Sequence, residues 1–239
     1  MSVTTLTSKP LELFLRSWHV YQEIIAYNYM YHREISESAR LALATFKAGE
    51  PLRVLDLGCG DASMALPLLE AGRIATYIGC DLSQPALDIA RNQLNAQGTQ
   101  HQLICAAMLQ AAEEQPDVSV DIVFSSYALH HLNAINKRQI IKAINRILAP
   151  GGYFVLIDIF REPAEDRPTY IRNYINAVHE QWNLLSPESQ NLVINHAKEY
   201  DFPEFSSFYE TECTHNRFAS RQRLSKHTWH ESWLFAKTL

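Results

Sequence analysis

The sequence is poor in the features that mark several protein classes. Its 239 residues contain no segment close to the roughly 20 apolar residues that cross a bilayer. Basic residues are not in excess, because 21 lysines and arginines face 26 aspartates and glutamates, for a formal charge of −5. That balance argues against a nonspecific nucleic-acid binder, and the first ten residues lack the basic and apolar regions of a signal peptide. We therefore expect a cytoplasmic protein without membrane contact.

Cysteine is also scarce, and its four residues form no C-x-x-C pair. They are Cys59, Cys80, Cys105 and Cys213. Three of them lie in or at the end of apolar segments, which is typical of reduced thiols in the core of an intracellular protein. No cluster of histidines and carboxylates with ligand spacing follows from the sequence, so no metal is predicted.

The composition that is present fits a globular protein. Hydrophobic residues make up 47% and charged residues 20% of the chain. Between residues 52 and 159, short β-rich segments alternate with helical patterns, which is typical of a parallel sheet with helices on both faces. The expected strands are 52–57, 74–80, 102–105, 120–126 and 153–159.

Two regions lie outside this alternation. Residues 10–47 read as helix, with Tyr27 and Tyr31 on one face. Residues 160–216 contain at least two further helical patterns and are too many for a plain loop, so they predict an inserted cap. After the cap, 218–224 and 230–237 resemble two strands, and the short link between them requires antiparallel pairing.

The scarcity of glycine makes its placement informative, since two of only eight follow the first expected strand. Gly58 and Gly60 would let the backbone turn sharply and approach a ligand. Asp81 ends the second strand 21 residues after Gly60, where a carboxylate can accept both hydroxyls of a ribose. A dinucleotide fits less well, because Ser63 stands at the third glycine position and Asp56 would repel a pyrophosphate. Asp56 would instead attract an ammonium group, so S-adenosylmethionine fits these residues.

Four motifs together resemble those of the class I S-adenosylmethionine-dependent methyltransferases. They are VLDLGCG at 54–60, IGCDLS at 78–83, DIVFSSYALHHL at 121–132 and LAPGGYFVLID at 148–158. The resemblance implies an α/β fold with a Rossmann-like seven-stranded sheet of order 3-2-1-4-5-7-6, strand 7 antiparallel, and helices on both faces. With the cap, it implies a methyltransferase domain over 48–239, a helical cap at about 160–216, and an N-terminal helical segment, 1–47, over the cofactor site.

The resemblance also implies the residues that hold the cofactor. They are Asp56, Gly58, Cys59, Gly60, Asp81, Leu82, Met108 and Ser125. The first four would surround the methionine end, Asp81 would hold the ribose, and Leu82 would cover the adenine. Many family members place an acidic residue near the adenine after strand three, whereas this chain has Ala107, so packing on Met108 or backbone groups would recognise the base. Ser125 would offer its backbone near the cofactor amine.

Acceptor and catalytic residues are expected near the ends of the fourth and fifth strands. Methyl transfer mainly requires that the acceptor be held in line with the methyl group and away from water. His130 and His131 are candidate general bases, although one could equally be a core histidine. Asp158 is a candidate partner of an acceptor amine or of a neighbouring basic group, and Arg161 of a carboxylate or phosphate. Tyr27 and Tyr31 are candidates to line the site or to pack the helix.

The leading hypothesis is methyl transfer from S-adenosylmethionine, with S-adenosylhomocysteine as product, to N, O, S or C of a small-molecule acceptor. An enclosing cap favours a metabolite over a macromolecule. A tRNA or protein substrate stays open, though the net charge counts against nucleic acid. The alternatives are a catalytically silent S-adenosylmethionine-binding protein and, less favoured, an NAD(P)-dependent oxidoreductase. The sequence is compatible with a homodimer.

Overall fold

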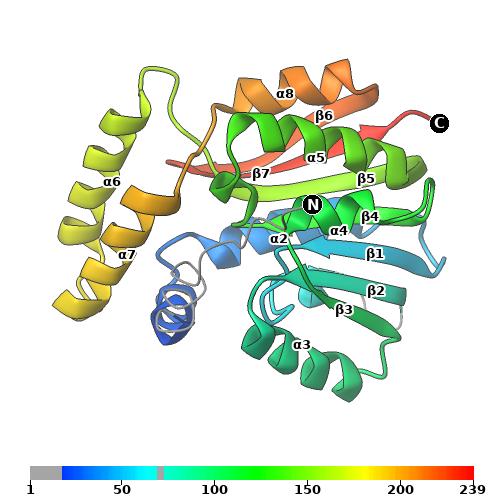
Figure 1. Cartoon of the computed structure of the whole chain (residues 1–239), viewed down its shortest axis with the longest axis horizontal. Helices are drawn as coiled ribbons and strands as arrows, with labels where there is room; N and C mark the ends of the chain where they lie inside the picture. The colour runs from blue at the N-terminus through cyan, green and yellow to red at the C-terminus, as the bar shows by residue number, and fades with distance from the viewer. Residues whose placement is uncertain (1–17, 69–72) are drawn as a thin grey trace, which may run out of the picture.

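Seven strands form one mixed sheet at the centre of the computed structural model, which describes residues 18–68 and 73–239 (Figure 1). Across the sheet the strands follow the order β3-β2-β1-β4-β5-β7-β6, and β7 runs antiparallel to both of its neighbours. The strands are β1 Leu52–Leu57, β2 Ile74–Asp81, β3 His101–Cys105, β4 Val120–Ser126, β5 Leu148–Ile159, β6 Phe218–His227 and β7 His230–Lys237. The predicted fold class and strand order are therefore confirmed.

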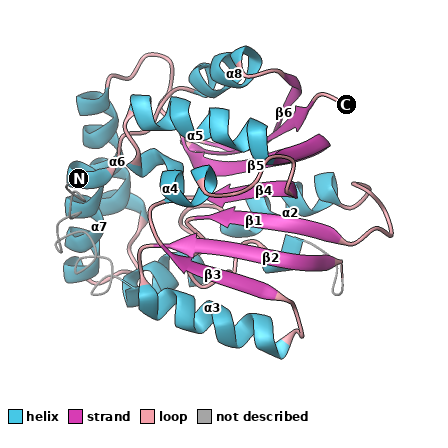
Figure 2. Cartoon of the chain, turned by 45° about the vertical axis from the view of Figure 1, so that its right-hand side comes forward, coloured by secondary structure: helices cyan, strands magenta, loops and turns pink. Residues whose placement is uncertain are grey.

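Helices cover both faces of this sheet (Figure 2). One apolar core joins α2 and α3 to one face, and a second joins α4, α5 and α8 to the other. The bounds are α2 His32–Leu43, α3 Gln84–Ala96, α4 Met108–Glu113, α5 Ala134–Ile147 and α8 Ser206–His215. This layering leaves the carboxyl ends of the parallel strands as the place where a ligand can approach.

Local signals explain where several of these helices begin. Ser83 is the N-cap of α3, where its hydroxyl accepts a hydrogen bond from the backbone N–H of Ala86 at 3.3 Å. Pro85 follows within the first turn, where a missing N–H costs nothing. A proline inside a helix kinks or ends it, and the residues around Pro67 accordingly form only the three-residue 3-10 helix η1, Leu66–Leu68.

The N-terminal segment departs from the expectation of one helix over 10–47. Residues 10–17 lie outside the described part of the chain. In the part that follows, residues 18–26 are helical, a turn occupies 27–30, and α2 begins at His32. Asn28 and Tyr31 adopt positive φ angles of 60° and 57°, which end one helix and redirect the chain into the next.

The cap consists of α6, Arg167–Gln181, and α7, Pro187–Tyr200. Both helices stand beyond the carboxyl ends of the parallel strands (Figures 1 and 2). The third helix of the expected cap segment 160–216, α8, packs on the sheet layer, where Tyr209 contacts Phe160 with ring centroids 5.4 Å apart.

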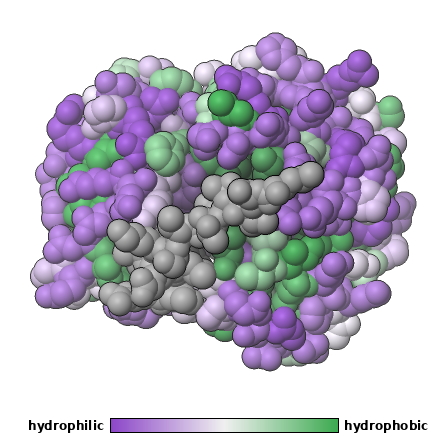
Figure 3. Space-filling model, viewed as in Figure 1, coloured by the Kyte–Doolittle hydropathy of each residue, from purple (hydrophilic) through white to green (hydrophobic). Residues whose placement is uncertain are grey.

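The surface of the molecule is mixed in polarity. The face seen in Figure 3 is mainly hydrophilic, with apolar residues in smaller patches. Over residues 18–68 and 73–239, none of the helices combines the length and hydropathy that a bilayer crossing requires.

Candidate functional site

Three carboxylates gather where β1 and β2 end. Asp81 accepts hydrogen bonds from the backbone N–H of Gly60 at 2.9 Å and of Ser83 at 2.8 Å, so both of its oxygens are oriented by the chain. Asp61 accepts a hydrogen bond from the N–H of Ser63 at 3.0 Å. The sequence predicts Asp56 and Asp81 at one site, and adjacent strand ends place them there.

Asp56 is the most deeply buried of the three, with 2% of its surface exposed. The hydroxyl of Tyr77 donates a hydrogen bond of 2.6 Å to its carboxylate. Burial raises the pKa of Asp56 to about 7, and the charges of Asp81 and Asp61 add to this effect. In the described part of the chain, none of the three acids forms an ion pair, so the group is suited to a cationic ligand.

The turn between these acids requires glycine at position 58. Its φ is 74°, and a Cβ placed there would lie 2.4 Å from the Cβ of Ala128. The N–H groups of Gly58 and Cys59 both donate to the carbonyl of Cys80 at 2.9 Å, which ties the turn to β2. Met108, at the start of α4, borders the same turn, since its Sδ lies 3.2 Å from that Cβ position.

Two aromatic residues that the sequence did not assign to the site cover this turn. The ring of Trp18 lies 3.9 Å from where a Cβ of Gly60 would stand. Burial raises the pKa of Tyr21, as do the charges of Asp61, Asp81 and Asp56, so the Tyr21 hydroxyl lies close to all three acids. The only signal in the sequence is that both precede Tyr27 and Tyr31 within the expected N-terminal helix.

The remaining predicted cofactor residues occupy the borders of the turn. Leu82 is 46% exposed directly after Asp81, and an exposed leucine there is compatible with covering a base. Ser125 is fully buried on β4, and its hydroxyl donates to the carbonyl of Leu57 at 2.9 Å. The cofactor contacts expected of both residues stay predictions.

A row of rings leads from the acids toward the cap. Tyr21 lies 6.2 Å from His32, His32 lies 4.9 Å from Tyr127, and Tyr127 lies 5.9 Å from His230, measured between ring centroids. Both ring nitrogens of His32 and Nδ1 of His230 are buried without a hydrogen-bond partner in the described structure. Burial lowers the pKa of His32 to about 4 and that of His230 to about 3, so both rings are neutral near pH 7.

A cavity of about 90 Å³ lies at the far end of this row. Its aromatic lining comprises Tyr29, Tyr31, Tyr174, Trp182, Trp229 and His230. Tyr31 also stacks on His227 with centroids 4.7 Å apart. Of the two tyrosines predicted to contact substrate, Tyr31 therefore borders the cavity, whereas Tyr27 is 41% exposed and is not part of its wall.

The paired histidines occupy the 3-10 helix η2, Leu129–His131, directly after β4. His130 is 4% exposed, and its Nδ1 lies 2.5 Å from an oxygen of the fully buried Asp158. Burial lowers the pKa of His130 and raises that of Asp158 to about 7. Asp158 thus pairs with a neighbouring histidine, which is one of the two roles expected for it. The base role of the histidines stays a prediction.

Arg161 is engaged within the protein. Its guanidinium donates to the carbonyls of Pro203 at 2.7 Å and Glu165 at 3.1 Å, and to the carboxylate of Glu204 at 3.3 Å. It also lies over the ring of Phe205, 4.2 Å from the centroid. These contacts anchor the segment that follows α7, and the expected role of Arg161 with a substrate anion stays untested.

The comparisons with known proteins agree with this geometry. A family described as "Methyltransferase domain" matches residues 54–152. A Synechocystis protein described as an uncharacterized methyltransferase is 36% identical over 112 residues, which are 46% of this chain and 48% of that protein. The carboxy-S-adenosyl-L-methionine synthase of Campylobacter lari is 27% identical over 183 residues, 70% of this chain and 76% of that enzyme. Residues 54–152 therefore form a methyltransferase domain of the class I S-adenosylmethionine-dependent type.

Solved structures support the same fold for this methyltransferase. A Thermotoga maritima protein described as an S-adenosylmethionine-dependent methyltransferase superposes with a TM-score of 0.59 at 18% identity, covering 95% of this chain and 99% of that one. The YcgJ protein of Bacillus subtilis gives 0.55 at 21% identity, covering 79% and 70%. The chain spans about half the length of the Synechocystis relative, so its substrate is a matter for proposal.

The residues of this methyltransferase fit the cofactor that the family implies. S-adenosylmethionine carries an ammonium, a sulfonium and a ribose. The chain offers a set of carboxylates without a counterion in the described part, and Asp81 would hold the ribose while Asp56 would face the ammonium. The glycine turn allows the backbone to come close to such a ligand.

Proposed function

We propose that this methyltransferase transfers the methyl group of S-adenosylmethionine to a small-molecule acceptor and releases S-adenosylhomocysteine. The observation that carries the proposal is the set of acids Asp56, Asp61 and Asp81 at or just after the ends of β1 and β2, which form no ion pair with any described residue. The cofactor supplies an activated methyl group, so the protein has mainly to bind, orient and exclude water.

The size and chemistry of the cavity support a small acceptor. Its aromatic walls offer apolar faces that hold a planar or a cationic group by stacking or cation–π attraction. His230 lines that cavity, His32 lies between it and the acids, and the neutral ring nitrogens of both, unpartnered in the described structure, can accept a hydrogen bond from the acceptor. We therefore assign the contacts with the polar part of the acceptor to these two histidines.

Cofactor binding is tested first by calorimetry with S-adenosylmethionine, S-adenosylhomocysteine and NAD(P) separately. Asp81→Ala should weaken binding of S-adenosylmethionine by about 1 to 3 kcal/mol, since it removes hydrogen bonds to a charged group. Asp88→Ala is the matched control, because Asp88 is an exposed acid on α3 that pairs with Arg91. Equal affinity of the two variants would remove Asp81 from the site.

Transfer is tested by incubating the protein with labelled S-adenosylmethionine and a panel of metabolites, among them aromatic and amine acceptors. Labelled product supports the proposal. Binding without transfer to any acceptor would favour the silent binding protein, and labelling of tRNA alone would favour the activity named for an Arabidopsis tRNA methyltransferase that is 32% identical over 47% of this chain.

A further inference from the structure

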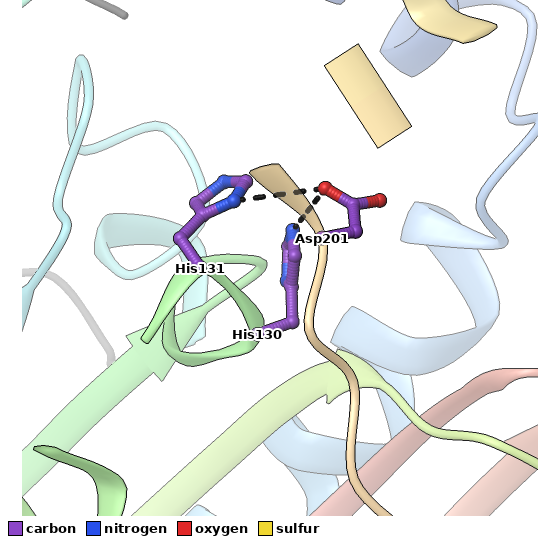
Figure 4. A group of neighbouring side chains, drawn as sticks. All are labelled: His130, His131 and Asp201. Atoms are coloured by element: carbon purple, nitrogen blue, oxygen red, sulfur yellow. Dashed lines mark ion pairs between the residues drawn. The ribbon is translucent and has the colours of Figure 1, made fainter. Parts of the chain in front are cut away.

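Three histidines and an aspartate converge beneath the cap from parts of the sequence some 70 residues apart. His130 and His131 lie on η2, His196 lies on α7, and Asp201 follows the end of α7. Figure 4 shows His130, His131 and Asp201 turned toward one another, and their nearest ligand atoms all lie within 4.8 Å of each other. Sequence spacing gave no sign of this group because the fold alone brings its members together.

The distances within the group suit metal coordination better than hydrogen bonding. Oδ1 of Asp201 lies 3.6 Å from Nε2 of His130, 3.6 Å from Nδ1 of His131 and 3.8 Å from Nε2 of His196. These separations exceed hydrogen-bond length. Ligands about 2.1 Å from a tetrahedral zinc ion are about 3.4 Å apart, so a small inward adjustment would bring His130, His131 and Asp201 to that geometry, and His196 would move further to join them.

The hydrogen bonds around the group direct lone pairs into it. In the tautomer with its proton on Nδ1, a neutral His130 ring donates to Asp158 and holds its free lone pair on Nε2, which faces Asp201. Oδ1 of Asp201 is buried, with 3% of the residue exposed, and has no hydrogen-bond partner in the described structure. A lone pair and a carboxylate oxygen that face each other repel, and a proton or a metal ion between them would relieve that repulsion. A carboxylate behind a ligating histidine is also common around zinc.

The nearby cations Lys137 and Arg167 act on the Asp201 carboxylate only through their charge, and in the described structure neither donates a hydrogen bond to it. Lys137 donates its Nζ hydrogen to the carbonyl of Phe202. Arg167 donates to the backbone carbonyls of Asp201 and Lys198 at 2.7 Å each, which leaves the Asp201 carboxylate to the histidines.

We propose that His130, His131, Asp201 and His196 bind a divalent transition metal ion, with zinc as the favoured ion. Three imidazoles and one carboxylate form a donor set that zinc accepts readily. The side chains of His131 and His196 are about one third exposed, at 33% and 32%, so the ion can reach the group from solvent. Binding at His131 replaces the contact of its Nδ1 with the carbonyl of Tyr200, 3.2 Å away.

Such an ion would join two parts of the molecule. Its ligands come from η2, which follows β4 of the sheet, and from α7 and the residue after it, which belong to the cap. Because the site exists only when sheet and cap are docked, metal binding would stabilise the docked state by mass action. The proposal concerns the cap and does not depend on which acceptor is methylated.

The test uses the full-length protein stripped with a chelator and titrated with zinc chloride against a chromophoric competitor, in the absence of S-adenosylmethionine. We expect one zinc ion per chain and a rise in melting temperature that the chelator reverses. Cobalt(II) chloride should give the intense visible bands of a tetrahedral ion. Absence of stoichiometric zinc binding would overturn the proposal.

Variants distinguish zinc binding at this site from nonspecific zinc binding by surface histidines. Asp201→Asn and His130→Gln should each weaken zinc binding by about tenfold or more, and Asp158→Asn, which leaves all four ligands in place, by about 10- to 100-fold through His130. His179→Gln on α6 is the control and should bind zinc as the unchanged protein does. Circular dichroism and S-adenosylmethionine binding report whether each variant is folded. Folded Asp201→Asn with unchanged zinc affinity would refute the site.

Discussion

Asp56 combines deep burial with a role that requires charge. Its pKa is raised to about 7 by burial, so the unliganded protein holds a neutral acid below that pH and a carboxylate above it. A ligand ammonium prefers the carboxylate. The affinity for S-adenosylmethionine should therefore rise by up to about tenfold per pH unit from pH 5.5 to 7 and level off beyond.

Asp56→Asn supplies the comparison. The amide keeps an acceptor for the Tyr77 hydroxyl but carries no charge, so binding should be weaker at pH 7.5 and nearly independent of pH. Calorimetry at four pH values measures both proteins. If the affinity of Asp56→Asn for S-adenosylmethionine still depended on pH in the same way, the titrating group would be another residue.

At this scale the sequence predicts some site residues and misses others for a physical reason. Asp56 and Asp81 could be predicted because strand ends in a parallel sheet share one edge. His32 and His230 could not, since they enter the site from α2 and β7, and only tertiary packing brings those elements together. Asp201 and His130 meet for the same reason.

Among the elements, α3 shows how one capping residue supports the cofactor site. Ser83 is 1% exposed and uses both its hydroxyl and its N–H, the first for the helix and the second for Asp81. Ser83→Ala should lower the free energy of unfolding by about 1 kcal/mol, as the loss of an N-cap does. Urea denaturation measures this change. Ser83→Thr keeps the hydroxyl and should lose much less, so equal losses in both variants would argue against capping.

The strands were predicted well and the N-terminal helices poorly. Short apolar segments locate β1, β2 and β4 to within a residue, and glycine or aspartate marks the ends of the first two. The sequence does not predict the break at 27–31, because the helical periodicity of apolar residues continues through it. In the structure, the positive φ angles of Asn28 and Tyr31 turn the chain there. The packing of α8 on the sheet depended on tertiary contacts of Tyr209 that periodicity does not encode.

At the scale of the whole molecule, the cap is docked on the N-terminal segment through Tyr29. Tyr29 stacks on Trp182 with centroids 5.0 Å apart and planes 8° from parallel, and its hydroxyl accepts a hydrogen bond from the N–H of Leu184 at 2.8 Å. Tyr29→Ala removes a stacking contribution of about 0.5 to 1.5 kcal/mol together with its buried area. Amide hydrogens of α6 and α7 should then exchange faster than they do in the unchanged protein, and those of β4 serve as the internal reference.

Tyr29→Phe keeps the stacked ring and removes only the hydroxyl, so exchange in the cap should change little. Mass spectrometry of peptides from both variants provides the measurement. Unchanged exchange in Tyr29→Ala would show that other contacts hold the cap.

The position of β7 between β5 and β6 has a consequence for synthesis on the ribosome. β5 is complete at Ile159, yet the partner that covers its free side is made only at residues 230–237. While roughly the next 70 residues are synthesised, the nascent chain therefore exposes the unpaired edge of an apolar strand. Such an edge can pair with other chains and promote aggregation. Chaperone engagement should persist until β7 has left the exit tunnel, and termination within β6 should yield insoluble product.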